Sequence, residues 1–275
     1  MTIAQALAMA ADLGLERVDA QLLLLQALGR PASDRAWLLA HDTDALDANQ
    51  QQQFTRLCGR RAAGEPLAYI AGHREFYGLE LAVDSRVLVP RPETETLVDW
   101  ALEVLAGTSA PHVIDLGTGS GAIALAIKAR RPDAQVVATD HSPRALEVAA
   151  GNAHALGVDI ELRRASWLAG ICERFDLVVS NPPYVAAADP HLAALGHEPL
   201  NALVAGPDGL DDLRTIVAQA PACLRDCGWL LVEHGYDQAA AVRALLAHAR
   251  FRQVASRADL AGIERCSGGQ WLELG

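Results

Sequence analysis

The sequence has no apolar stretch long enough to cross a membrane as a helix. No uninterrupted apolar run approaches the roughly 20 residues that such a helix needs. The first apolar stretch has no basic region ahead of it and is soon followed by Asp12 and Glu16, so it lacks the pattern of a secretory signal peptide. We therefore expect a cytoplasmic protein that makes no contact with a membrane.

Cysteine is scarce and is not spaced for a metal site or a disulfide framework. The five cysteines are an odd number, lie among apolar neighbours and include no CxxC pair. Cys223 and Cys227 are four residues apart and could meet on a helix, but two thiolates alone make a poor zinc site. We expect small core residues in a reducing compartment, and no metal.

Positive charge is also scarce, which bears on the class of partner. The chain has 23 Lys and Arg against 34 Asp and Glu, a formal net charge of −11. Proteins that bind duplex DNA or structured RNA usually present a basic face to the phosphates. Here the basic residues cluster only in pairs, such as Arg60-Arg61, so we expect no direct binding to nucleic acid. The sequence does not determine the oligomeric state, and we expect a monomer.

The apolar pattern divides the 275 residues into three parts. Residues 1–70 space their apolar side chains by three and four between Gly14, Gly29 and Gly64, which predicts a small helical bundle. We expect this bundle to dock the substrate. Residues 71–88 have short alternating runs typical of a β-hairpin linker. In residues 89–275 strands and helices alternate, which predicts an α/β domain with a doubly wound, mainly parallel sheet.

A glycine-rich loop follows the first predicted strand of that domain, in "DLGTGSGAIALAI". Gly117, Gly119 and Gly121 allow a tight turn and a close approach to a ligand, with Thr118 and Ser120 between them. The motif GxGxG is weak by itself, since dinucleotide enzymes carry a similar loop and a purely structural turn is an alternative. No phosphate-binding GxxxxGK[ST] lysine is present, which disfavours a nucleoside triphosphate.

Two acids beside this loop narrow the choice of ligand. Asp115 precedes the glycines, and Asp140 ends the second strand, where its carboxylate can accept the hydroxyls of a ribose. A ligand with an ammonium group, a ribose and no phosphate fits this pair, and S-adenosylmethionine has these features. NAD is the alternative, disfavoured because no hydride-handling arrangement is found nearby. Trp167, after the third strand, could pack on an adenine ring or be a core tryptophan.

The sequence "FDLVVSNPPYV" ends the fourth strand with an unusual motif. Pro182 and Pro183 have fixed φ angles and no N–H, so the segment presents hydrogen-bond acceptors in fixed positions. The Asn181 side-chain oxygen and the Pro182 carbonyl could each accept one N–H of a planar NH2 group and aim its nitrogen at a sulfonium methyl. Tyr184 could stack on that group. We therefore expect Asn181, Pro182 and Tyr184 to be catalytic, with Pro183 completing the substrate site.

Four motifs together resemble one family: "DLGTGSGAIALA", "NPPY", the upstream "VPRPETE" and the downstream "HEPLNALVAGPDGL". The chain is similar over its whole length to the bacterial peptide chain release factor N5-glutamine methyltransferases. The resemblance implies methylation of the side-chain amide of the glutamine in the GGQ motif of release factors. It also implies that S-adenosylmethionine is the cofactor, S-adenosylhomocysteine is the product and release factors are the protein partners.

The resemblance also implies roles for individual residues. Thr94 and Glu95 would close over the methionine end of the cofactor, and Glu198 and Pro199 would brace the loop after NPPY. One departure is visible, because Ser166 stands where the family often has an acid that contacts adenine. The full set of cofactor-binding residues that we expect is Asp115, Gly117, Thr118, Gly119, Ser120, Gly121, Asp140, Trp167 and Asn181.

Three alternatives stay open on the sequence. A related ribosomal protein glutamine methyltransferase shares NPPY, and amino methyltransferases of DNA or rRNA share the chemistry but usually add a basic recognition domain. A non-catalytic binding module with the same fold is the third, and the intact NPPY argues against it. Residues 267–271, "SGGQW", reproduce a GGQ tripeptide, which we interpret as a Gly-Gly turn before the last strand.

Overall fold

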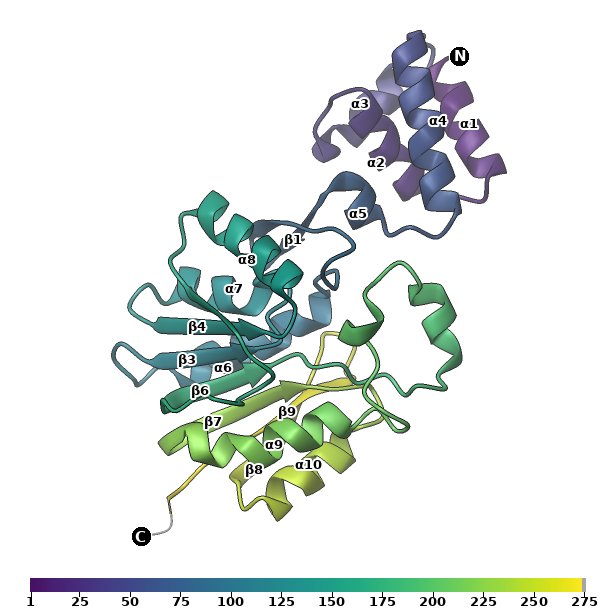
Figure 1. Cartoon of the computed structure of the whole chain (residues 1–275). Helices are drawn as coiled ribbons and strands as arrows, with labels where there is room; N and C mark the ends of the chain where they lie inside the picture. The colour runs from purple at the N-terminus through teal and green to yellow at the C-terminus, as the bar shows by residue number, and fades with distance from the viewer. Residues whose placement is uncertain (274–275) are drawn as a thin grey trace. The chain divides into compact units, whose positions relative to one another are not determined.

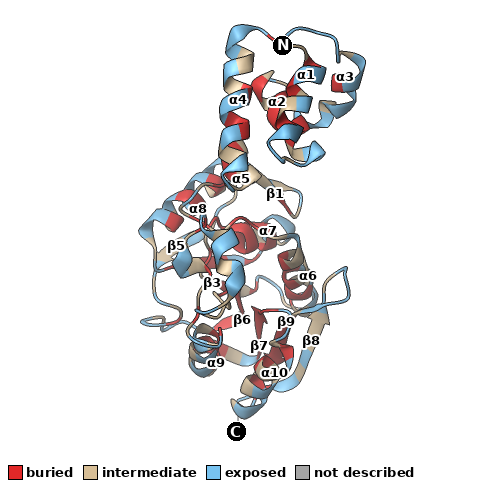
Figure 2. Ribbon diagram, turned by 90° about the vertical axis from the view of Figure 1, so that its right-hand side faces the viewer, coloured by how far each residue is buried: buried red, intermediate tan, exposed pale blue. Residues whose placement is uncertain are grey.

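The computed structural model describes residues 1–273. The chain forms two compact units, Met1–His73 and a second unit that begins at Arg74. Helices and strands carry the labels of Figure 1. Each unit has its own buried core, coloured red in Figure 2, and the two are described separately.

The first unit is entirely helical apart from its connections. Thr2 and Asp47 cap two of its helices, each through a reciprocal pair of hydrogen bonds with the glutamine three residues later. Gly14, Gly29 and Gly64 follow helix ends with positive φ, as the sequence predicts. The buried side chains include Leu23, Leu24, Phe54 and Leu57. The helices are α1 (Ile3–Asp12), α2 (Arg17–Ala27), α3 (Arg35–Ala40), α4 (Ala48–Ala62) and α5 (Leu67–Ala71), with a short 3-10 helix at Ala32–Asp34.

A two-stranded hairpin, β1 (His73–Phe76) and β2 (Leu79–Ala82), follows. Its turn residues Tyr77 and Gly78 both have positive φ, which suits the right-handed twist of a hairpin. The side chain of Asn152, in α8 (Pro143–Leu156), makes two hydrogen bonds with the backbone of Ala82. This contact attaches the hairpin to the larger unit.

The larger unit contains a seven-stranded sheet in the order β5-β4-β3-β6-β7-β9-β8. The first five strands in this order pair in parallel, and β9 is antiparallel to both β7 and β8. The strands are β3 (His112–Leu116), β4 (Gln135–Asp140), β5 (Glu161–Arg164), β6 (Phe175–Ser180), β7 (Leu224–Glu233), β8 (Arg252–Ala258) and β9 (Glu264–Gln270). The predicted doubly wound, mainly parallel fold is confirmed.

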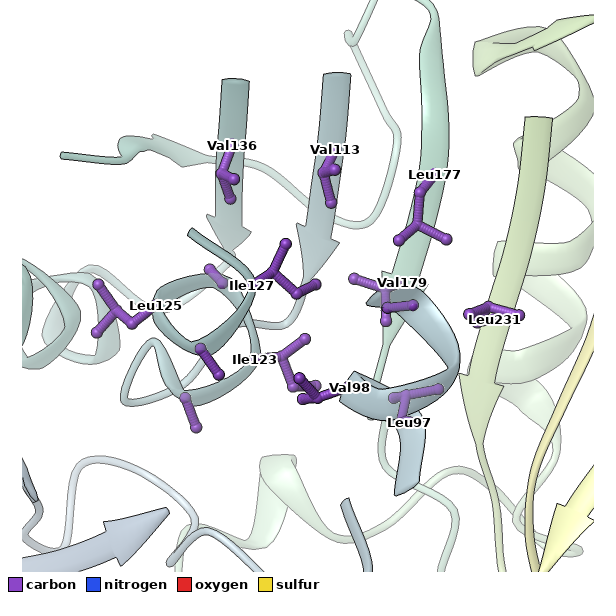
Figure 3. Packing of buried hydrophobic residues seen from close by; sticks show 14 of the residues in the cluster. Leu97, Val98, Val113, Ile123, Leu125, Ile127, Val136, Leu177, Val179 and Leu231 are labelled. Carbon is purple, nitrogen blue, oxygen red and sulfur yellow. The ribbon is translucent and has the colours of Figure 1, made fainter. Parts of the chain in front are cut away.

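Helices cover both faces of the sheet (Figure 1). One face packs on α6 (Glu95–Val104) and α7 (Ala122–Arg130), where Val98 and Ile123 meet Val113 and Val179 of the strands (Figure 3). The other face packs on α9 (Asp211–Cys223) and α10 (Ala239–His248). Successive residues of a strand point to opposite faces of the sheet and are buried in the hydrophobic core on each face. This burial on both sides fixes the position of the strand ends.

The expected Gly-Gly turn in SGGQW is wrong. Gly268 and Gly269 lie inside β9, paired with Leu231 and Leu230 of β7. A Cβ on Gly268 would lie 2.4 Å from Leu231 Cδ2 and 2.8 Å from the Leu230 oxygen. The glycines are therefore required by close packing against β7, which local turn propensity does not reveal.

We expect Gly268→Ala to lower the free energy of unfolding by about 1–3 kcal/mol, because the added methyl overpacks the sheet. Urea denaturation measures the change. Gly107→Ala is the matched control, since a Cβ there meets no heavy atom within 4 Å. Equal stabilities of the two variants would contradict the packing argument.

Candidate functional site

The site lies beyond the carboxyl ends of β3, β4 and β6. The glycine loop leaves β3, and Gly117, Gly119 and Gly121 all have positive φ. The Thr118 N–H donates to the Thr139 oxygen at 2.8 Å, and the Gly119 N–H donates to Asp140 Oδ2 at 3.0 Å. These bonds join the loop to the end of β4.

A cavity of about 460 Å³ opens over this loop. That volume is in the usual range for a small-molecule site, about 300–1,000 Å³. The predicted cofactor residues on its wall are Gly117, Thr118, Gly119, Ser120, Asp140, Trp167 and Asn181. The other two, Asp115 and Gly121, are not on the wall: Asp115 is fully buried, and Gly121 turns the chain into α7 as its N-cap residue.

Asp115 is a buried carboxyl with an incomplete set of partners. Its Oδ2 accepts a hydrogen bond from the Thr118 hydroxyl at 2.6 Å, while Oδ1 has no partner within residues 1–273. Burial raises the pKa of Asp115 to about 7. In its ionised form this carboxyl concentrates negative potential at the loop, which suits a cationic ligand and costs stability without one.

We expect Asp115→Asn to stabilise the ligand-free protein above neutral pH. In the unfolded chain the carboxyl has a pKa of about 3.9. In the pH range between this value and the folded pKa of about 7, the folded protein holds a proton that the unfolded chain has lost. The free energy of unfolding therefore falls as pH rises through this window, and an uncharged amide removes the fall.

Urea denaturation at about pH 5 and about pH 8 measures this effect through the change in stability between the two values. The exposed Asp159→Asn is the control, and it should respond to pH as the wild type does. An Asp115→Asn protein with the wild-type pH response would contradict the assignment.

Asp140 and Trp167 both line the cavity. The two Asp140 oxygens accept backbone N–H groups from Gly119 and Ser142, the latter at 2.8 Å, and each oxygen keeps a lone pair for a ligand. The Trp167 ring lies against Gly117, where a Cβ would be only 3.2 Å from the ring. This approach explains why the first glycine of the loop is needed.

Asp212, at the start of α9, is a cavity residue that the sequence did not reveal. It hydrogen-bonds with Trp167, and burial raises its pKa. Asp212 and Trp167 are 45 positions apart in the sequence and come together only in the folded protein, so no sequence motif predicts this contact. Ser166 also lines the cavity.

A second cavity of about 320 Å³ adjoins the NPPY segment. Pro182 and Tyr184 line it, whereas Pro183 lines the first cavity. Three residues line both cavities, Leu88, Asn181 and Ala202, and of these Asn181 has a polar side chain. The predicted catalytic motif therefore separates a cofactor-sized cavity from a second space.

Several contacts fix the NPPY segment. The Ser180 hydroxyl donates to the Leu116 oxygen at 2.8 Å, which ties the end of β6 to β3. Asn181 Nδ2 donates to Thr94 Oγ1 at 3.2 Å. Gln238 Nε2 donates to the Tyr184 oxygen at 3.0 Å, and the Tyr184 hydroxyl donates to Glu233 at 3.3 Å. Burial raises the pKa of Tyr184, so its hydroxyl stays protonated.

The residues of the VPRPETE and HEPLNALVAGPDGL segments agree only in part with the roles that the resemblance implies. Thr94 lines the first cavity, but Glu95 Oε1 accepts the Tyr77 N–H at 3.0 Å and is not on either wall. The expectation that Glu95 closes over the cofactor is therefore not met. Glu198 accepts the Val89 N–H at 3.1 Å and pairs with Arg91, which braces the loop after NPPY.

Within residues 1–273, no group of three His, Cys, Asp or Glu side chains is arranged to hold a metal ion. None of the helices in that range has the length and apolar character required to span a membrane.

Two family models match the chain: the PrmC N-terminal domain over residues 2–72 and the methyltransferase small domain over residues 96–199. A release factor glutamine methyltransferase of Xylella fastidiosa is 51% identical and aligns with 96% of this chain and 97% of its own length. One of Bordetella pertussis is 50% identical, over 94% of this chain and 96% of its own length.

Among solved structures, the catalytic domain of hMettl16 in complex with an RNA hairpin has a TM-score of 0.59 at 18% identity. It covers 79% of this chain and 82% of that chain, and it supports the fold alone. The sequence relatives carry the stronger evidence, and they confirm the family that the four motifs predict. The chain belongs to the release factor glutamine methyltransferase family and is a methyltransferase that depends on S-adenosylmethionine.

Proposed function

We propose that the protein transfers a methyl group to the side-chain amide nitrogen, N5, of the glutamine in the GGQ motif of peptide chain release factors. One observation carries the proposal: Asn181 stands between the two cavities, with its NH2 group donating to Thr94. The Asn181 oxygen is therefore available as an acceptor for the substrate. The relatives named for the same activity support the choice of substrate.

The first cavity fits the cofactor. Asp140 offers acceptor lone pairs for a ribose, Trp167 offers an aromatic face for adenine, and the buried Asp115 lies under the loop, where a cationic ligand would favour its ionised form. Gly117, Thr118, Gly119, Ser120 and Gly121 shape the loop so that its backbone can approach the ligand. When bound, S-adenosylmethionine supplies an electrophilic methyl group on a positively charged sulfur.

The NPPY segment holds the nucleophile. An amide nitrogen is a poor nucleophile, because its lone pair is delocalised into the carbonyl. The Asn181 oxygen and the Pro182 carbonyl each accept one N–H and aim the nitrogen at the methyl group. As the nitrogen attacks it gains positive charge, so both acceptors bind it more tightly in the transition state than in the ground state. Pro183 fixes the backbone, and the Tyr184 ring covers the planar amide.

We further propose that residues 1–70 dock the release factor, with 71–88 as the linker and 89–275 as the catalytic domain. The enzyme would act as a cytoplasmic monomer without direct contact to nucleic acid. The acidic balance of the chain supports a protein substrate over DNA or rRNA.

The test is transfer of labelled methyl from S-adenosylmethionine to a purified release factor. We expect label on the wild-type factor and none on a factor whose GGQ glutamine is replaced by alanine. A structured RNA and a ribosomal protein run in parallel as alternative acceptors. Label on either of these, and none on the release factor, would overturn the proposal.

A further inference from the structure

We propose that Glu233 is a specificity-determining residue, which accepts a backbone N–H of the GGQ segment in the second cavity. The inference deepens the proposed function and rests on it. In that function Asn181 and Pro182 accept the two N–H bonds of the glutamine amide. Glu233, the last residue of β7, lines the same cavity and adds an acceptor for the peptide that carries the amide.

Glu233 is a buried acceptor that lacks a donor. It lines the second cavity yet is only 1% exposed, so it lies in a deep part of the wall. Oε1 accepts the Tyr184 hydroxyl at 3.3 Å, whereas Oε2 has no hydrogen-bond partner within residues 1–273. Buried polar atoms are nearly always hydrogen-bonded, because an unpaired one costs free energy. An unpaired acceptor on a cavity wall therefore indicates a donor that the ligand brings.

Two arginines of the same cavity are engaged with other acids. Arg91 pairs with Glu198, and Arg265 Nε donates to Asp259 Oδ2 at 3.2 Å. Their charges favour the ionised form of Glu233 without filling the place of its missing donor. Oε2 is thus left for a ligand.

The ionisation of Glu233 decides whether it can accept. Burial raises its pKa to about 7, and Glu93 acts in the same direction, while Arg265 opposes them. Burial also raises the pKa of Tyr184 and Cys266, which face Glu233 and stay protonated. A substrate N–H that donates to Oε2 favours the ionised form, so the pKa of Glu233 falls in the complex. Substrate affinity should therefore rise as pH rises towards about 7.

The GGQ segment has the donors that this acceptor needs. Its two glycines carry no side chains that would shield their N–H groups, so the backbone can approach a wall closely. The adenine and cytosine of a nucleic acid have no N–H besides their amino group. They would leave Glu233 unpaired, and a site built around such a hydrogen bond strongly rejects a ligand that lacks it. Glu233 therefore favours an NH2 group on a peptide over one on these bases.

The test measures the affinity for a release factor by calorimetry, with S-adenosylhomocysteine at saturation. At about pH 8, Glu233→Gln should bind about 5- to 10-fold more weakly, because a neutral acceptor replaces a charged one. The loss should shrink at about pH 6, where the wild-type carboxyl is mostly protonated. With the release factor at saturation, kcat should stay within about 2-fold of wild type, since the contact is present before and during methyl transfer.

Thermal melting separates this role from a structural one. At about pH 8 the Glu233→Gln protein should melt no lower than the wild type, because the amide removes an unpaired buried charge. A structural role predicts a lower melting temperature together with the weaker binding. Glu103→Gln, an exposed glutamate paired with Arg257, is the matched control and should change neither quantity.

A release factor whose GGQ glutamine is replaced by alanine tests the contact with the backbone. Glu233→Gln should weaken binding of this factor by the same ratio, because the replacement leaves the backbone N–H groups in place. A ratio that falls to one would mean that Glu233 contacts the glutamine side chain, which contradicts the inference.

The outcomes are distinguishable from a failure of the proposed function. Absence of methyl transfer by the wild type to any release factor would overturn the proposed function itself. Wild-type transfer together with unchanged affinity in Glu233→Gln, or with a loss of affinity that does not grow with pH, would overturn the role of Glu233 alone.

Discussion

Replacement of Asn181 by alanine should lower turnover by about 10²-fold or more while leaving cofactor binding nearly intact. Under the proposed function, the lost oxygen is an acceptor that works mainly in the transition state, when the attacking nitrogen becomes positively charged. The Asn181 backbone is held by β6, whose end is tied to Leu116 by Ser180, so the truncation should not move the cofactor cavity. Single-turnover methyl transfer gives the rate of the chemical step.

Calorimetry with S-adenosylhomocysteine supplies the internal control for Asn181→Ala. An affinity within a few-fold of wild type, beside a strongly reduced rate, is the expected pair of results. Normal turnover would show that the amide nitrogen is not held by Asn181, and a large loss of cofactor affinity would assign the residue to binding instead of catalysis.

Asp140→Ala should have the opposite profile: a weaker cofactor complex with a smaller effect on the rate at saturating cofactor. A hydrogen bond to a charged group contributes about 1.5–3 kcal/mol, so we expect affinity to fall by about 10- to 100-fold. The variant also loses the bonds from the Gly119 and Ser142 N–H groups, which loosens the loop that forms the cavity floor. Both effects act in the same direction on binding.

Calorimetric titration with S-adenosylhomocysteine measures the effect of Asp140→Ala. Asp159→Ala is the matched control, since Asp159 is exposed and lies in the connection before β5, away from both cavity linings. Equal affinities of the Asp140 and Asp159 variants would remove Asp140 from the cofactor site.

The parts of the site that could be predicted are those encoded by neighbouring residues. The glycine loop and NPPY each depend on consecutive residues whose backbone preferences are local, so their place at strand ends followed from the strand pattern alone. Asp140 was predictable for the same reason, because parallel strands bring their carboxyl ends to one edge of the sheet.

The parts that could not be predicted depend on long-range contacts. Glu233 and Asp212 reach the two cavities from β7 and α9, and no spacing in the sequence pairs them with Tyr184 or Trp167. The expectation that Glu95 closes over the cofactor came from its position next to Thr94 in the sequence. That position does not reveal that its side chain accepts the Tyr77 N–H of the hairpin instead. Packing, which decides such contacts, is a property of the whole fold.

The strand that contains Gly268 and Gly269 has a consequence for how the enzyme could distinguish its substrate. Its own Gln270 follows two glycines, as in the GGQ motif, yet the Gln270 amide is already engaged. Nε2 donates to the Cys227 oxygen at 3.0 Å, and Oε1 accepts from Gln253 at 2.8 Å. A tripeptide fixed in a sheet cannot extend its glutamine into another molecule's cavity. Under the proposed function, recognition would depend on the conformational freedom of the GGQ segment as well as on its amino-acid sequence. The folded enzyme would then not methylate its own Gln270.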